Sequence, residues 1–157
     1  MLKKLNKTYL KPAIIIILLT VAIATTATSV ALLSTSQSLP SSGKINTSAN
    51  TGVYSDSASQ DTLTTINWGN LTAGAHVHRT IYVKNIDNSQ SIDLHMTTSN
   101  WNPSTANGNM TLSWNQENTN TKPGQIVEAT LTLAVSPNIV EITNFSVQIS
   151  INGTPTT

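Results

Sequence analysis

The regular alternation of apolar and polar side chains is the feature of this sequence that most restricts its fold. The clearest case is the segment Ala75–Lys84. Val77, Ile81 and Val83 fall on one side of the extended chain there, and polar residues dominate the other side. A period of two residues is that of a β-strand with one buried and one solvated face. This stretch therefore predicts a strand, and Thr72–Gly74 before it predicts a tight turn.

Similar alternation recurs along the chain from residue 44 onward. Apolar residues share one face in the segments 44–53, 63–68, 91–98, 109–115, 127–135 and 145–151. Turns rich in Asn, Pro, Gly and Ser separate these segments, among them an expected loop at residues 100–109 and a long polar turn at residues 116–124. No convincing helical period follows Leu33. About seven short strands joined by such turns are typical of an all-β sandwich with mostly antiparallel pairing. We therefore predict a two-layer β domain over residues 44–157.

The N-terminal part has a different composition. Residues 1–11 contain four lysines and no acidic residue, and residues 12–33 are uncharged and mostly apolar. About 20 such residues can cross a bilayer as a helix, and the basic flank predicts a cytoplasmic N-terminus. We expect four parts: a cytoplasmic basic segment (1–11), a transmembrane or signal-anchor helix (12–33), a Ser-rich linker (34–43) and a β ectodomain (44–157).

Cleavage of the apolar segment is the open alternative. Residues 14–24, followed by the small and hydroxylated residues 25–29, can be read as a signal peptide, whose apolar region is shorter than a membrane anchor. The apolar run Val30–Leu33 that continues after them favours an uncleaved anchor. Both interpretations place the β domain outside the cytoplasm. The chain is then a single-pass protein of the cell membrane or a secreted protein.

The composition excludes several classes of function. Only 10% of the residues are charged, against about 25% in an ordinary soluble domain, the formal net charge is +1 and there is no cysteine. Thiolate metal sites and a cysteine nucleophile are therefore excluded, and no basic surface indicates a nucleic-acid partner. No serine elbow or phosphate-binding glycine loop is present, so we expect neither an enzyme nor a bound cofactor.

Several motifs together carry a resemblance to a known family. They are Trp68-Gly69-Asn70-Leu71, the turn at Gly74 and the long strand after it, within the segments 52–88, 94–114, 122–137 and 142–153. These segments resemble a recurrent immunoglobulin-like domain of archaeal exported and cell-surface proteins. Ala73 stands where that family usually has proline, and Asp87-Asn88 where it has an Asn-Gly turn. The resemblance implies an immunoglobulin-like antiparallel β-sandwich outside the cell, and it supplies no catalytic residue.

The layout of the chain is also similar, less closely, to β-sandwich pilin subunits of some archaeal filaments. In those filaments an N-terminal strand completes the sandwich of the next subunit. Residues 44–53, which are poor in large side chains, fit such a donor strand. They fit an ordinary edge strand equally well.

Three histidines are candidate metal ligands. His76 and His78 share the polar face of the strand at residues 75–84, and His95 lies on the polar face of the next predicted strand. Together they could bind zinc or copper. Because no acidic residue stands beside them in the sequence to orient the rings, a solvated face is the favoured interpretation.

Tryptophans and glycosylation motifs are the other candidates. Trp68 and Trp114 are in phase with the inward residues, and Trp101 lies in a predicted polar loop, where an exposed aromatic platform or a lid over the core edge is expected. Asn-x-Ser/Thr motifs, predicted at turns or strand ends where glycan could be attached, begin at Asn46, Asn70, Asn109, Asn144 and Asn152.

Three hypotheses about function follow from these observations. The first is a membrane-anchored surface protein with a structural or adhesive role, which contacts the membrane through residues 12–33 and itself or other surface proteins through the β domain. The second is a secreted filament subunit that exchanges a strand after signal cleavage. A metal- or sugar-binding module that uses the histidines or Trp101 comes third.

Overall fold

Segments with a two-residue period pair through their main chains into β-sheets. A computed structural model describes residues 41–156 of the chain as two such sheets. The predicted cytoplasmic segment (1–11) and the predicted anchor helix (12–33) lie outside the described residues. Within residues 41–156, no helix has the length and apolar character needed to span a bilayer.

Nine strands and one short helical turn make up residues 41–156. In chain order they are β1 (Ser41–Thr47), β2 (Thr51–Tyr54), β3 (Thr65–Asn67), β4 (His76–Asn85), β5 (Ile92–Asn102), α2 (Ala106–Asn109), β6 (Met110–Trp114), β7 (Asn120–Thr121), β8 (Ile126–Val135) and β9 (Phe145–Pro155). The prediction of a mostly β domain with almost no helix is confirmed.

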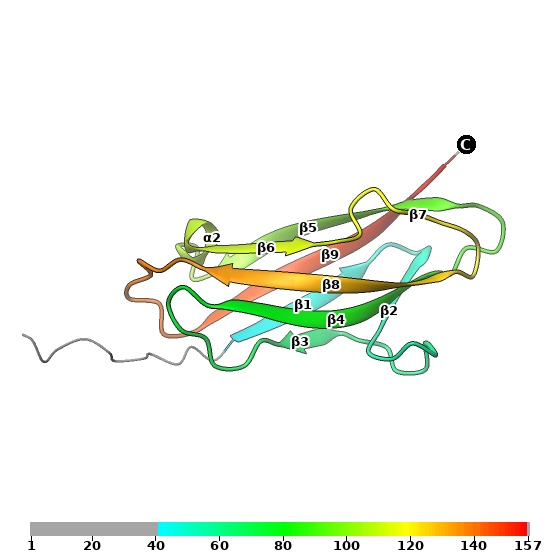
Figure 1. The fold of residues 1–157 in the computed structure, drawn as a ribbon. Helices are drawn as coiled ribbons and strands as arrows, with labels where there is room; N and C mark the ends of the chain where they lie inside the picture. Colours follow the sequence, from blue (N-terminus) through cyan, green and yellow to red (C-terminus); the bar gives the residue numbers. More distant parts are fainter. Residues whose placement is uncertain (1–40, 157) are drawn as a thin grey trace, which may run out of the picture. The chain divides into compact units, whose positions relative to one another are not determined.

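The strands form a five-stranded sheet in the order β3-β1-β9-β5-β7 and a four-stranded sheet in the order β2-β4-β8-β6 (Figure 1). Neighbouring strands are antiparallel in both sheets, with the exception of β1 and β9, which are parallel. The two sheets lie over one another, and the chain passes between them several times. The expected antiparallel arrangement therefore holds for every pair but one.

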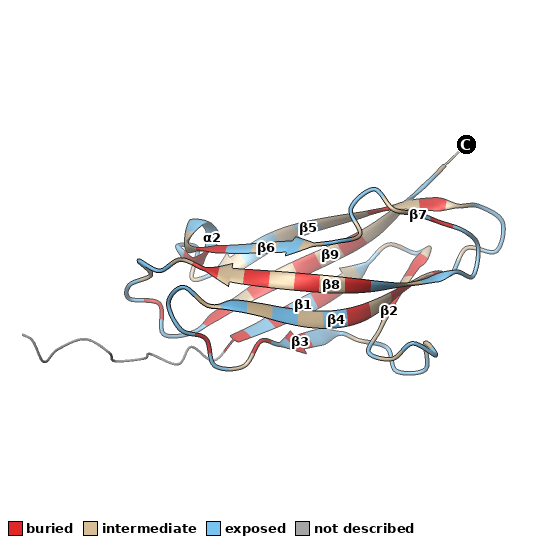
Figure 2. Cartoon of the chain, viewed as in Figure 1, coloured by how far each residue is buried: buried red, intermediate tan, exposed pale blue. Residues whose placement is uncertain are grey.

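One hydrophobic core lies between the sheets, as the buried bands on facing strands show (Figure 2). The alternation predicts its members well. On β9 the expected inward residues, Phe145, Val147, Ile149 and Ile151, are all buried. On β4 Ile81 and Val83 are buried, and Val77 is half-buried. The other large, fully buried side chains are Val53, Trp68, Leu71, Ile92, Leu94, Leu131 and Leu133.

The predicted single strand at residues 44–53 is wrong. The chain turns at Ser48–Asn50, so β1 joins the five-stranded sheet and β2 joins the four-stranded sheet. Polar side chains favour this turn, because the hydroxyl of Ser48 donates a hydrogen bond to the side chain of Asn50. Such local side-chain bonds compete with the backbone pairing of a continuous strand. The strand β1 also begins at Ser41, within the predicted linker at 34–43.

The structure has nine strands where about seven were expected, because residues 44–53 form two strands and one further short strand is present. The short strand β7 lies inside the predicted polar turn at residues 116–124. β5 extends to Asn102, although residues 100–109 were predicted to be a loop from their Asn, Pro and Gly content. Pairing with the long strand β9, past a bulge between Ser99 and Asn102, keeps this part of β5 extended.

Candidate functional site

The strand β1 is the first strand of the described residues and is not an edge strand. It lies inside the five-stranded sheet, between the short edge strand β3 and the last strand β9. Its parallel register with β9 runs from Ser41 opposite Phe145 to Thr47 opposite Ile151. Its antiparallel register with β3 runs from Ser42 opposite Asn67 to Lys44 opposite Thr65. The main chain of β1 is thus paired on both sides, and β1 completes the sheet.

The side chains of β1 make few contacts with the core, and its main chain makes most of its contacts with the sheet. Its inward residues are Ser41, Gly43 and Ile45, so Ile45 is the one large apolar side chain that β1 adds to the core. A Cβ atom on Gly43 would lie 2.9 Å from Cδ1 of Ile149 and 3.2 Å from Nε1 of Trp68. Any side chain at this point would force Ile149 or Trp68 to shift, because these core residues approach the backbone of β1 closely.

A polar hinge follows β1. The hydroxyl of Ser48 donates to Oδ1 of Asn50 at 2.7 Å and accepts a hydrogen bond from the backbone N–H of Gly153 at 3.0 Å. Nδ2 of Asn50 donates to the carbonyl of Gly153 at 3.1 Å. These bonds fix the point at which the chain leaves β1 and crosses to the four-stranded sheet. They are contacts between polar groups, which water can also satisfy.

An open surface hollow of about 630 Å³ lies beside the start of β1. Its walls are mostly small polar side chains and backbone from β1, β3, the start of β9 and the adjoining loops. They include Ser41, Ser42, Asn67, Asn70, Asn102 and Asn144. Two of the five predicted glycosylation motifs, those at Asn70 and Asn144, therefore lie at the same opening, and both asparagines are exposed.

The other three glycosylation motifs are less open. Asn46 is half-buried on β1, and Asn109, at the end of α2, donates its side-chain amide to the carbonyl of Thr105 at 2.9 Å. Asn152 lies inside β9, which continues to Pro155, so its predicted position at a strand end is wrong. Asn70 and Asn144 are the motifs that a transferase could reach most easily on the folded domain.

The three histidines do not converge. His76 and His78 lie on β4 in the four-stranded sheet, whereas His95 lies on β5 in the five-stranded sheet. Among residues 41–156, no group of three His, Asp or Glu side chains is placed to hold one metal ion. The predicted set of three imidazoles is therefore not brought together. Sequence spacing could not show this, because neighbouring strands in the chain need not share a sheet.

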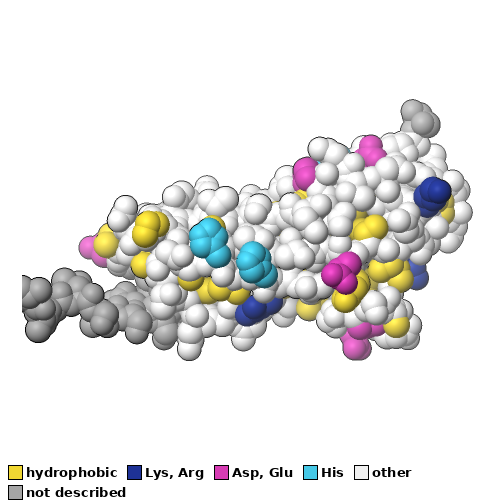
Figure 3. Space-filling view, viewed as in Figure 1, with side chains coloured by type: hydrophobic (Ala, Val, Ile, Leu, Met, Phe, Trp, Pro, Cys, Tyr) yellow, Lys and Arg dark blue, Asp and Glu magenta, His cyan; other side chains and the backbone are white. Residues whose placement is uncertain are grey.

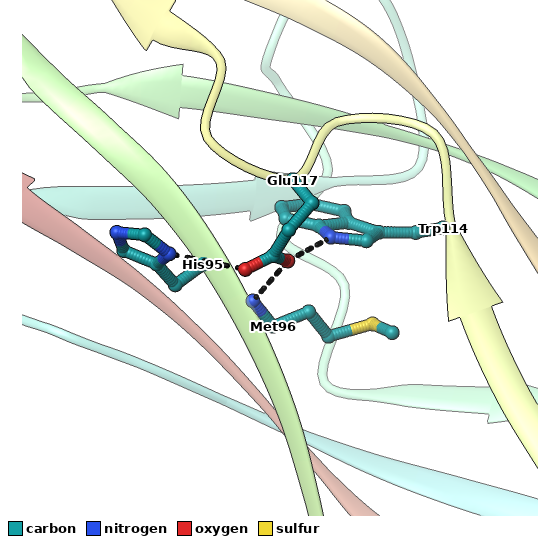
Figure 4. A network of polar contacts seen from close by, with 4 residues as sticks. All are labelled: His95, Met96, Trp114 and Glu117. Carbon is teal, nitrogen blue, oxygen red and sulfur yellow. Dashed lines mark hydrogen bonds and ion pairs between the residues drawn. The ribbon is translucent and has the colours of Figure 1, made fainter.

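His95 has an acidic partner, contrary to the prediction that none of the histidines has one. Its Nδ1 lies 3.0 Å from Oε1 of Glu117. Oε2 of the same carboxylate accepts hydrogen bonds from Nε1 of Trp114 at 2.7 Å and from the backbone N–H of Met96 at 3.1 Å (Figure 4). Trp114 ends β6 and His95 lies on β5, so Glu117 joins the two sheets at one edge.

The charge of Glu117 is favoured in this setting. Partial burial of the carboxylate opposes ionisation, but the hydrogen bonds from Trp114, His95 and Met96 together outweigh it and lower the pKa of Glu117. The contact is thus a structural clamp between the sheets. Glu117 lies in a polar turn far from His95 in the sequence, so no local pattern signals this pairing.

Arg79 forms a second link between the sheets, which the sequence analysis did not predict. It stands on the inward side of β4, between Val77 and Ile81. Its Nε donates to the carbonyl of Asn67 at 2.9 Å and its Nη2 to the carbonyl of Trp68 at 2.8 Å. The sequence does contain a signal for this contact, because Arg79 is in phase with the inward residues Val77 and Ile81. A charged side chain that is turned inward needs hydrogen-bond partners.

Trp101 is not an exposed loop residue. It lies on β5, is half-buried and stacks on Phe145, with ring centroids 5.9 Å apart and an interplanar angle of 23°. Its Nε1 lies 3.4 Å from the hydroxyl of Thr98. Of the two predicted roles, a lid over the core edge fits this packing, and a free aromatic platform does not.

Compared with models of known protein families and with curated proteins, the sequence matches none of them. The functional argument therefore rests on the geometry of residues 41–156, and above all on the place of β1.

Proposed function

We propose that this chain is a structural protein of the cell surface whose immunoglobulin-like sandwich links to further copies through β1. The observation that carries the proposal is the position of β1 between β3 and β9, directly after the N-terminal segment. A strand at this place can be supplied by the same chain or by a neighbouring copy. In the second case each copy completes the sheet of the next, and a linear filament results.

The contacts of β1 suit such an exchange. Most of its pairing uses backbone hydrogen bonds to β9 and β3, which an identical strand from another copy would reproduce in the same register. Ile45 is the one large side chain that must leave the core, and the polar hinge at Ser48–Asn50 can open toward water. Most of the free energy needed to release β1 from its own sheet is therefore the loss of main-chain hydrogen bonds. These bonds form again when β1 pairs with the sheet of a neighbouring copy.

The second candidate is an anchored surface module in which β1 stays within its own chain. The apolar segment at residues 12–33 and the presence of β1 in the sheet of its own domain favour this reading. Both candidates share the sandwich, the location outside the cytoplasm and a non-enzymatic role. They differ in which copy supplies β1.

A cysteine cross-link distinguishes the two candidates, since the natural chain has no cysteine. Lys44 on β1 lies opposite Gln148 on β9. Adjacent strands are about 4.8 Å apart, within reach of a disulfide. The K44C/Q148C variant, expressed as the full chain and oxidised, gives a ladder of covalent multimers if β1 is exchanged. The ladder should coincide with filaments seen by electron microscopy.

The opposite result is a single band of monomer mass with the disulfide inside one chain. That result rejects strand exchange and leaves the anchored module. A matched control is K44C/S113C, because Ser113 is exposed on the other sheet and should not cross-link to position 44 in either candidate.

A further inference from the structure

His76 and His78 form an exposed pair on the outer face of the four-stranded sheet (Figure 3). They stand two residues apart on β4, so both side chains project from the same face, with Cα atoms about 7 Å apart. On the side away from β8, β2 pairs only with Tyr82–Asn85, so within residues 41–156 no strand flanks the histidine pair there. The pair is open to a ligand from solvent.

A neighbouring hydroxyl orients one of the two rings. Nδ1 of His78 lies 3.0 Å from Oγ1 of Thr132, its cross-strand neighbour on β8. When the protonated Nδ1 donates to this hydroxyl, the lone pair of the neutral ring is on Nε2. Nε2 takes no part in the contact with Thr132 and can then bind a metal ion. A hydrogen bond from the non-ligating nitrogen is the usual device that orients a metal-binding histidine.

We propose that His76 and His78 are one half of a divalent transition-metal site, which a second copy of the chain completes with the same two residues. Imidazole nitrogen suits Zn²⁺, Cu²⁺ and Ni²⁺. Zn²⁺ normally takes four ligands in a structural site, and one chain offers two here. Two copies related by a two-fold axis supply four imidazoles around one ion.

The surface around the pair allows two copies to approach. The adjoining outward positions on β4, β6 and β8 are small and uncharged; they are Thr80, Thr111, Ser113, Thr130, Thr132 and Ala134. At these positions no charged or long side chain holds two such faces apart. Arg79 is turned to the carbonyls of Asn67 and Trp68, and Glu128, opposite Tyr82, is the charged residue further along the same face. The contact joins the outer faces of four-stranded sheets and does not depend on exchange of β1, which lies in the other sheet.

Titration of the full, tag-free chain with Zn²⁺ in detergent tests the proposal by calorimetry. The expected stoichiometry is one ion for two chains, and binding should be lost in H76A/H78A. The T132V variant should bind Zn²⁺ about tenfold more weakly, because the ring of His78 is no longer held. The matched T130V variant removes a hydroxyl two residues away on the same strand and should bind like the natural chain.

His95 gives an internal control on the other sheet, so H95A should also bind like the natural chain. Circular dichroism must show the β fold in every variant. The proposal is overturned if the natural chain shows no heat of Zn²⁺ binding, or if H76A/H78A shows the same heat of binding as the natural chain. A ratio of one ion for each chain would overturn the part that requires a second copy.

Discussion

Nε1 of Trp114 lies 2.7 Å from Oε2 of Glu117, and Oε1 of the same carboxylate lies 3.0 Å from Nδ1 of His95. The two contacts connect the last residue of β6 to the first half of β5, and so join the two sheets through side chains, next to the backbone hydrogen bonds that Asn118 and Thr119 form with Leu94. Because all three side chains are partly exposed, we expect a moderate contribution to stability and a clear dependence on pH.

Replacement of Glu117 by glutamine should therefore destabilise the domain at neutral pH by about 1 kcal/mol, after allowance for solvent screening. The pKa of Glu117 is lowered in the folded state, so its stabilisation is present above the pKa of the unfolded chain and is lost as the pH falls through the folded pKa. Urea unfolding of both proteins should show a difference at pH 7 that shrinks under acid conditions.

The E141Q variant is the control for this experiment, because Glu141 is an exposed residue in the loop before β9. Its unfolding curve should follow that of the natural chain at every pH. A difference between E117Q and the natural chain that stays constant down to pH 2 would contradict the assigned role of the carboxylate charge.

Gly43→Ala should destabilise the domain by about 1–3 kcal/mol. The added methyl would lie within 2.9 Å of Ile149 and 3.2 Å of Trp68, so these core residues or β1 must shift. Ser42→Ala on the exposed side of the same strand should change stability by less than about 0.5 kcal/mol. Chemical unfolding measures both, and equal effects at the two positions would show that β1 is not packed as described.

Arg79→Met should destabilise the domain by about 1–2 kcal/mol, since the carbonyls of Asn67 and Trp68 lose their guanidinium donors. Arg79→Lys should recover only part of the loss, because an ammonium cannot reproduce the planar set of donors. Lys84→Met, five residues further along β4 and on its outward face, is the control and should be close to neutral. Thermal unfolding that ranks R79M with K84M would contradict a bridging role for Arg79.

The carboxylate of Asp87 organises the turn after β4. Hydrogen bonds from the backbone N–H and hydroxyl of Ser89 and from the N–H of Gln90 lower the pKa of Asp87. Ser89→Ala removes one of these donors, so the pKa of Asp87 should rise toward the usual range of an aspartate. Titration followed by carboxyl carbon chemical shifts measures this, and an unchanged value would mean that the hydroxyl does not bond to the ionised carboxylate.

Asp56 shows the same behaviour in the loop after β2. Hydrogen bonds from the backbone N–H of Asp61, and then of Gln60 and Ala58, lower the pKa of Asp56, while slight burial opposes the shift. Its pKa should therefore stay low in the S89A variant, which makes it the internal reference for the titration. A parallel rise at Asp56 and Asp87 would point to a global change of the domain and would contradict a local effect of Ser89.

The sequence by itself determined most of the strands and which of their faces is buried, although it missed the break between β1 and β2 and the short strand β7. Phe145, Val147, Ile149 and Ile151 could be assigned to the core because alternation is a local property, read from a few consecutive residues. The turn at Gly74 could be assigned as well, since its φ of 75° favours glycine for steric reasons that involve only its own backbone.

Only the tertiary structure decided which strands are neighbours. It placed β1 between β3 and β9, separated His95 from His76 and His78, and brought Glu117 to His95. Strand pairing uses backbone groups that nearly every residue possesses, so the side chains of β1 carry little information about its partners. The position of β1, on which the proposed function rests, follows from the way the whole chain closes its two sheets around one core.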